Sequence, residues 1–69
     1  MNLQNTIKER RKTLSLSQND LSEMSGLSLA TIKSIERGKG NPSITTVSRI
    51  MDVLGMEIIY RVRNTIIEE

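Results

Sequence analysis

The chain has 69 residues, a formal net charge of +2, and neither cysteine nor histidine. A chain of this length forms one small domain with a marginal core, to which oligomerisation would add stability. Because it has no cysteine or histidine, it offers no disulfide, no thiolate metal site and no assembled nucleophile–base pair. Because no apolar run could span a bilayer or serve as a signal peptide, we expect a cytoplasmic protein that is not an enzyme, binds no metal or cofactor and does not enter the membrane.

Residues 3–14 are predicted to form the first helix, because Leu3, Ile7 and Leu14 recur at helical spacings. Arg11 lies on the same side. The other basic residues of this helix are Lys8, Arg10 and Lys12. Such a cluster fits either a solvated helix face or a nucleic-acid contact, and a groove-sized helix nearby favours the contact.

Residues 18–38 are predicted to form two short helices joined by a tight turn. Ser17 can cap the first helix and Gly26 can end it, while Ser28 can cap a second helix that ends at Gly38. Apolar residues recur three positions apart in each helix, as Leu21 and Met24 and then as Ile32 and Ile35. We expect this cluster to fix the angle between the helices and to leave the polar, basic face of the second helix free to enter a groove.

The same stretch carries residues that are specific only in combination, namely Gln18, Leu21, Gly26, Leu27, Ile32, Ile35 and the run Glu36-Arg37-Gly38. Together they resemble the lambdoid phage repressor and Cro class of helix-turn-helix regulators, the Xre family. The resemblance covers roughly residues 3–55 and implies that Arg11 pairs with Glu36, tying the first helix to the end of the third. It departs from the usual pattern at Arg10 and Ser22, where we expect local loosening.

The resemblance also implies which residues contact double-stranded DNA. The family positions that face base edges are matched by Ser28, Leu29, Ala30, Lys33 and Ser34, and those that hold phosphates by Gln18, Arg37 and Lys39. Lys33 can donate to guanine acceptors, whereas Leu29 and Ala30 can touch only apolar features such as the thymine methyl group. Specificity is therefore expected to depend on DNA shape as well as on base contacts.

A loop over residues 39–43 precedes a fourth predicted helix over residues 44–54, which Ser43 can cap and Gly55 can end. Its apolar face consists of Ile44, Val47, Met51 and Leu54, with Ile50 at the edge. We expect this helix to pack in the core, so that residues 3–55 form a helix-turn-helix DNA-binding domain.

Beyond Gly55 the apolar period changes to two, which predicts a strand over residues 56–63. Met56, Ile58, Tyr60 and Val62 form one face, and Glu57, Ile59, Arg61 and Arg63 the other. A lone strand needs a partner, and the simplest is the same strand of a second copy about a two-fold axis. The first face is then the dimer interface. The alternative is a strand that folds back to cap its own domain.

The run Leu54-Gly55-Met56-Glu57 is similar to that of regulators like the HipB antitoxin, in which the helix-turn-helix is followed by Leu-Gly and a dimerising strand. Residues 64–69 are expected to be a C-terminal tail that either extends the strand or frays. The fold expected is mainly α, a small four-helix lambda-repressor-like domain with one C-terminal β-strand that completes an intersubunit two-stranded sheet.

Two functions fit these expectations. The first is a sequence-specific DNA-binding transcriptional regulator, a repressor, that acts as a homodimer on an inverted-repeat operator. The second is an antitoxin that binds a toxin protein and autoregulates its operon. Single-stranded nucleic acid fits less well, because stacking of bases requires aromatic side chains and Tyr60 is the only one in the chain.

Overall fold

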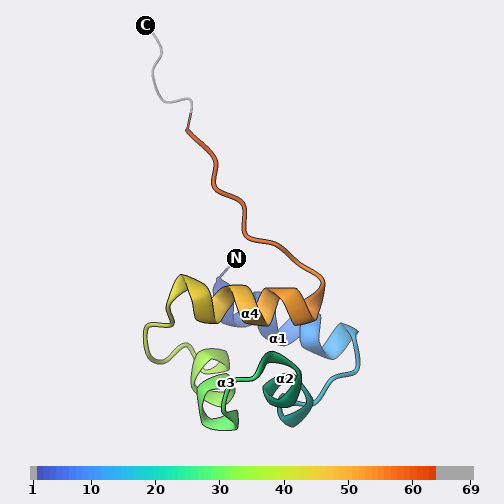
Figure 1. Cartoon of the computed structure of the whole chain (residues 1–69). Helices are drawn as coiled ribbons and strands as arrows, with labels where there is room; N and C mark the ends of the chain where they lie inside the picture. The colour runs from blue at the N-terminus through green and yellow to red at the C-terminus, as the bar shows by residue number, and fades with distance from the viewer. Residues whose placement is uncertain (1, 64–69) are drawn as a thin grey trace, which may run out of the picture.

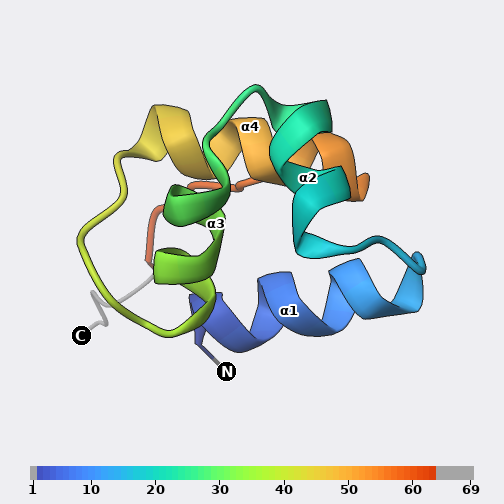
Figure 2. The same cartoon turned by 90° about the horizontal axis from the view of Figure 1, so that it is seen from below.

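The computed structural model describes residues 2–63, and these contain four α-helices (Figure 1). They are α1 (Leu3–Thr13), α2 (Gln18–Ser25), α3 (Leu29–Glu36) and α4 (Ile44–Leu54). Helices α2 and α3 contact each other and cover one side of the pair formed by α1 and α4, as Figures 1 and 2 show from two directions. The predicted four-helix architecture is confirmed. Within the described residues, no helix has the length and apolar composition needed to cross a bilayer.

Each helix begins at a polar side chain that accepts a hydrogen bond from a backbone N–H of the first turn. These caps are Asn2, Ser17, Ser28 and Ser43, so the three predicted serine caps are confirmed. Gly26 and Gly55 end α2 and α4 with φ of +75° and +68°, a conformation that glycine adopts readily. Helix α3 ends at Glu36, two residues before the predicted Gly38.

The cap of α2 is reciprocal. The Ser17 hydroxyl oxygen accepts from the Asp20 N–H, and the Asp20 carboxylate accepts from the Ser17 N–H, both at 2.9 Å. Hydrogen bonds from the Ser17 backbone and, second, its side chain lower the pKa of Asp20. Such a box satisfies two backbone donors that the helix start would otherwise leave unpaired.

We expect Ser17→Ala to lower the free energy of unfolding by about 0.5–2 kcal/mol, the usual range for loss of a cap.

The contribution of the Asp20 carboxylate to the free energy of unfolding should depend on pH. A carboxylate with a lowered pKa stabilises the fold above its ordinary pKa and loses that effect as the pH falls through the lowered value. The difference in unfolding free energy between the wild-type chain and Asp20→Ala should therefore shrink below about pH 4. Urea denaturation at several pH values measures both effects, and a difference independent of pH would contradict the second.

The core is made by apolar side chains of all four helices, namely Ile7, Leu21, Ile32, Ile35, Val47, Ile50, Met51 and Leu54. The prediction of Met24 as a core residue is wrong, since its side chain is 60% exposed. Leu21 and Ser25 are the buried residues of α2, and at 100° per residue Met24 points about 80° away from the direction between them. Ile50, expected at the edge of its helix, is fully buried.

Three apolar residues expected on the core stripes, Leu3, Leu14 and Ile44, are exposed. Leu3 and Ile44 are the first residues of their helices, and Leu14 follows the last residue of α1. At these ends the neighbouring helices no longer cover the stripe.

The loosening expected at Arg10 and Ser22 is wrong, because both side chains form hydrogen bonds. The Arg10 Nε donates to the Leu54 carbonyl oxygen at 2.9 Å, which places a cation at the carboxyl end of α4, where the helix dipole favours it. The Ser22 hydroxyl donates to the Leu27 carbonyl oxygen in the turn before α3. Each departure from the family pattern thus joins two elements of the fold.

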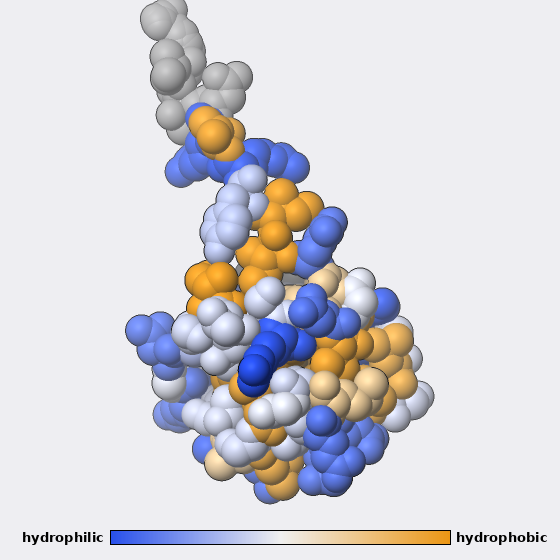
Figure 3. All heavy atoms as spheres, viewed as in Figure 1, coloured by the Kyte–Doolittle hydropathy of each residue, from blue (hydrophilic) through white to orange (hydrophobic). Residues whose placement is uncertain are grey.

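Residues 56–63, here called the C-terminal segment, leave the domain at the end of α4 on the side away from α2 and α3 (Figures 1 and 2). Met56 and Ile58 pack against the core, whereas Ile59, Tyr60 and Val62 are 68%, 76% and 95% exposed. In Figure 3 apolar and charged residues follow one another along the segment, which stands clear of the helices.

The part of the chain that the structure describes contains no strand. The segment is extended, and a single extended stretch has no neighbour with which to form a ladder. The predicted two-stranded sheet therefore stays a prediction about a dimer. The alternative, a segment that folds back and caps its own domain, fits only Met56 and Ile58, which pack against the core. The predicted tail, residues 64–69, lies outside the described residues.

Candidate nucleic-acid interface

A buried ion pair holds α3 against α1. Arg11 Nε and Nη2 donate to the two carboxylate oxygens of Glu36 at 2.7 and 2.9 Å, and Arg11 Nη1 donates to the Leu16 carbonyl oxygen at 2.7 Å. The Glu36 side chain is 2% exposed, and its hydrogen bonds with Arg11 raise the pKa of Arg11. This planar, bidentate geometry fixes the carboxyl end of α3, and with it the outward face of that helix.

Gln18, predicted as a phosphate contact, is the first residue of α2 and is half-buried. Its side-chain Nε2 donates to Glu36 Oε1 at 3.2 Å and so joins the ion pair. The side chain therefore helps to hold α2 against α3. Its backbone N–H lies in the first turn of α2, where helix N–H groups can bind an anion.

The outward face of α3 carries the residues predicted to meet base edges. Ile32, Ile35 and Glu36 are buried on the inner side. The opposite stripe consists of Leu29, Ala30, Lys33, Ser34 and Arg37, of which Leu29 and Ser34 are half-buried and the other three exposed. The structure thus brings these residues together on one side of α3. Figure 1 shows that α3 has a side that faces away from the other helices.

Ser28 is exposed at the start of α3, but its hydroxyl is already engaged. It donates to Thr31 Oγ1 at 2.8 Å and accepts from the Thr31 N–H at 3.1 Å. A hydroxyl has one proton, so in this arrangement Ser28 can only accept from a DNA base. Sequence reasoning missed this restriction, which follows from the side chain three positions further along the helix.

An open groove of about 440 Å³ lies beside this stripe, between α3, the following loop and the first turn of α4. Its polar lining includes Thr31, Ser34, Lys39, Asn41, Ser43 and Thr46. Thr31, Asn41 and Thr46 were not predicted as site residues. The sequence offered only a weak signal for them, a loop with two glycines and a proline next to a capped helix.

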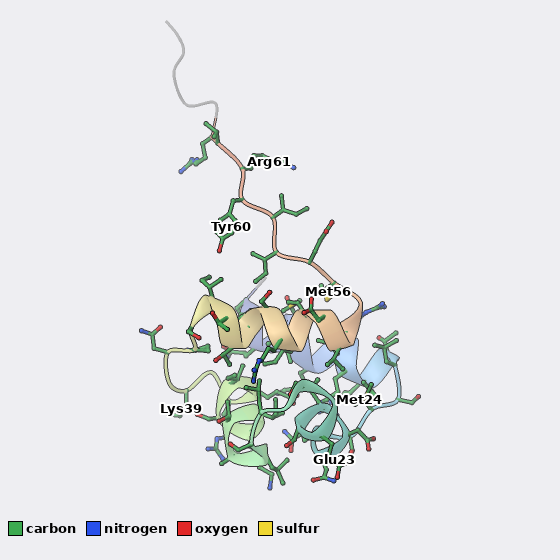
Figure 4. All side chains as sticks on the ribbon, in the orientation of Figure 1. Glu23, Met24, Lys39, Met56, Tyr60 and Arg61 are labelled. Atoms are coloured by element: carbon green, nitrogen blue, oxygen red, sulfur yellow. The ribbon has the colours of Figure 1, made fainter. Side chains whose placement is uncertain are left out.

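The exposed cations of this surface come from α3 and the residues after it. Lys33 lies in the last turn of α3, Arg37 is its cap, and Lys39 lies in the loop toward α4 (Figure 4). The surface can therefore donate charge-assisted hydrogen bonds to an anionic polymer. Among residues 2–63, no group of three metal-ligating side chains is placed to hold a metal ion.

Comparison with known proteins agrees with this geometry. The family model described as helix-turn-helix (HTH_3) matches residues 7–60, most of the chain. The chain is also 42% identical over 53 residues to a protein of Methanothermobacter thermautotrophicus described as an uncharacterized HTH-type transcriptional regulator, a match that covers 77% of each sequence. The chain belongs to the Xre-type helix-turn-helix family.

Proposed function

We propose that this protein is a DNA-binding transcriptional regulator that represses its target genes as a homodimer. The observation that carries the proposal is the uncovered stripe of α3, which presents Ala30, Lys33 and Arg37 on a helix whose other side is buried. An α-helix of this kind fits the major groove of B-DNA. The family match and the description of the relative support a DNA-binding regulator.

In this proposal the base edges are contacted by Ser28, Leu29, Ala30, Lys33 and Ser34. Lys33 donates to guanine, Leu29 and Ala30 touch thymine methyl groups, and Ser28 accepts from a base amino group. Gln18, Arg37 and Lys39 contact phosphates, which position the helix without reading sequence.

The dimer is joined through the C-terminal segment, with Met56, Ile58, Tyr60 and Val62 on the interface face. The segment leaves the domain opposite α2 and α3, so a dimer joined there leaves both copies of α3 uncovered (Figure 1). The two copies of α3, related by a two-fold axis, fit an inverted-repeat operator with half-sites about 10 base pairs, or roughly 34 Å, apart. Selection of bound sequences from random duplex DNA tests this, and recovery of no inverted repeat would contradict it.

The alternative, an antitoxin that holds a toxin protein, receives no support from the comparisons, since neither match is described as an antitoxin. Repetition of the selection with and without a co-purified partner protein separates the two functions.

We expect Arg37→Ala and Lys39→Ala each to weaken binding to every duplex sequence. A phosphate contact releases condensed counterions, so each change should reduce the slope of log K against log salt by about one. Fluorescence anisotropy titrations at several salt concentrations measure the slope. Arg49→Ala, an exposed cation of α4 that is not among the predicted DNA contacts, is the matched control. An unchanged slope in the α3 variants would reject the phosphate assignment.

Lys33→Ala should behave differently, because a base contact carries sequence information. We expect it to cost roughly 1–3 kcal/mol on the best site and to relax the preference at one or two positions of each half-site. The measurement is a repeat of the sequence selection with the variant. Equal weakening on all sequences would instead identify Lys33 as a phosphate contact.

A further inference from the structure

The C-terminal segment has one face that its own domain only half covers. Met56 and Ile58 contact the core, but Tyr60 and Val62, the next residues on that side, are 76% and 95% exposed. Figure 4 shows Tyr60 beyond the helices. The apolar face thus extends past the surface that its own chain supplies.

Most of the backbone of this segment is also unpaired among the described residues. Met56 N donates to the Met51 carbonyl oxygen, and beyond it no backbone hydrogen bond joins residues 57–63 to another described residue. Extended backbone of this kind, with free donors and acceptors, is a template for pairing with another strand.

The other face carries charges of opposite sign at equal distances from Ile59. Glu57 lies two residues before Ile59 and Arg61 two residues after it. In an antiparallel ribbon about a two-fold axis, each residue lies opposite the one at the same distance on the other side of the centre. A centre at Ile59 therefore places Glu57 of each copy opposite the partner's Arg61.

We propose that two copies of this chain pair antiparallel over residues 56–62 with Ile59 at the two-fold axis. The inference rests on the homodimer of the proposed function and specifies its register. On the charged face it makes two Glu57–Arg61 pairs, and on the apolar face it places Ile58 beside Tyr60 and Met56 beside Val62. Opposite charges and aromatic–β-branched pairs directly across a ribbon are stabilising.

The neighbouring registers pair the residues of the two faces less well. A centre at Ile58 places Glu57 opposite Ile59 and leaves Arg61 opposite Gly55. A centre at Tyr60 places Glu57 opposite Arg63 but sets Ile59 against Arg61. Side chains of directly paired residues lie on the same face of the ribbon. A centre between two residues would pair residues of opposite faces, so the centre must coincide with a residue.

The register at Ile59 also accounts for the exposed apolar face. Tyr60 and Val62 come to lie beside the partner's Ile58 and Met56, which contact the partner's core. The face that a single domain only half covers is then covered by two domains in succession. The charged face points away from both cores, where its ion pairs remain at the surface.

Charge reversal tests the register. Glu57→Arg and Arg61→Glu should each weaken the dimer on the order of tenfold, since each sets like charges opposite one another twice. The double variant should return the dimer dissociation constant to within about threefold of the wild-type value. Sedimentation equilibrium of the full chain measures the dimer dissociation constants of the wild-type chain, the two single variants and the double variant. Glu57→Arg combined with Arg63→Glu is the matched control and should not restore the dimer.

The outcomes separate the register from the homodimer itself. If the wild-type chain sediments as a monomer at micromolar concentration, the proposed homodimer fails and the register with it. If the wild-type chain is a dimer but Arg63→Glu rescues Glu57→Arg where Arg61→Glu does not, only the register is overturned. Because the chain has no cysteine, Ile59→Cys offers a second readout. It should form a disulfide-linked or bis-maleimide-linked dimer faster than Ile58→Cys or Tyr60→Cys, and an equal rate for all three would contradict the register.

Discussion

A chain that ends at Gly55 is expected to bind its operator about 10²- to 10⁴-fold more weakly than the full chain, because linking two binding modules raises affinity by that range. All four helices precede this point, so the truncated chain should keep most of its helical circular dichroism. It should sediment as a monomer. A truncated chain that remains a dimer with intact operator affinity would show that the C-terminal segment is not the interface.

A point substitution gives a sharper version of the same test. Val62 is 95% exposed in the single chain, so Val62→Lys adds a charge without disturbing the domain. In a ribbon dimer the same charge lies on the apolar face, where burial without a partner is costly. Ile58→Lys is less informative, because Ile58 also packs against its own core. Asn5→Lys, which adds the same charge at an exposed site of α1, should leave both sedimentation and DNA binding unchanged.

Arg11→Ala should lower the free energy of unfolding by about 3–5 kcal/mol, since it leaves the carboxylate of Glu36 buried without its cation. A domain of 69 residues has a total stability of roughly 3–10 kcal/mol, so at the lower end of this range much of the population would unfold. Urea denaturation followed by circular dichroism measures the loss. Lys12→Ala, the exposed neighbour, should change stability by less than about 0.5 kcal/mol.

The double variant shows whether the loss comes from the pair. Once Arg11 is absent, Glu36→Ala removes a destabilising charge, so the two changes together should cost clearly less than the sum of the single costs. Gln18→Ala should cost less than Arg11→Ala, because a neutral amide at 3.2 Å supplies a weaker hydrogen bond than a bidentate guanidinium. Independent addition of the Arg11 and Glu36 effects would contradict the ion pair.

The helices of this protein could be predicted well because their ends depend on neighbours in sequence. Each serine cap bonds a backbone N–H three residues later, and Gly26 and Gly55 adopt their conformation without tertiary help. The position of a side chain around a short helix is harder to predict. In α2, which has eight residues, a small rotation exchanges Met24 for Ser25 on the buried side.

The placement of the candidate site residues was predictable where one helix carries them, and less so where several elements meet. The stripe of α3 follows from helical spacing alone, but Arg10 meets the end of α4 across 44 residues of sequence. Asn41 and Thr46 line the groove only because the loop brings α4 back beside α3. The C-terminal segment is a third case, since its period of two predicts a strand whose hydrogen bonds require a second molecule.

A single residue connects α4 to the C-terminal segment. Gly55 makes the turn alone, and Met56 N already bonds back to the last turn of α4 at 2.9 Å. Insertion of a single residue here would turn every following side chain to the opposite face, presenting Glu57 and Arg61 to the cores. Insertion of two would restore the faces but, in the proposed dimer, would change the distance between the two copies of α3. Relatives that recognise operators of different half-site spacing are therefore expected to differ at this join by even numbers of residues.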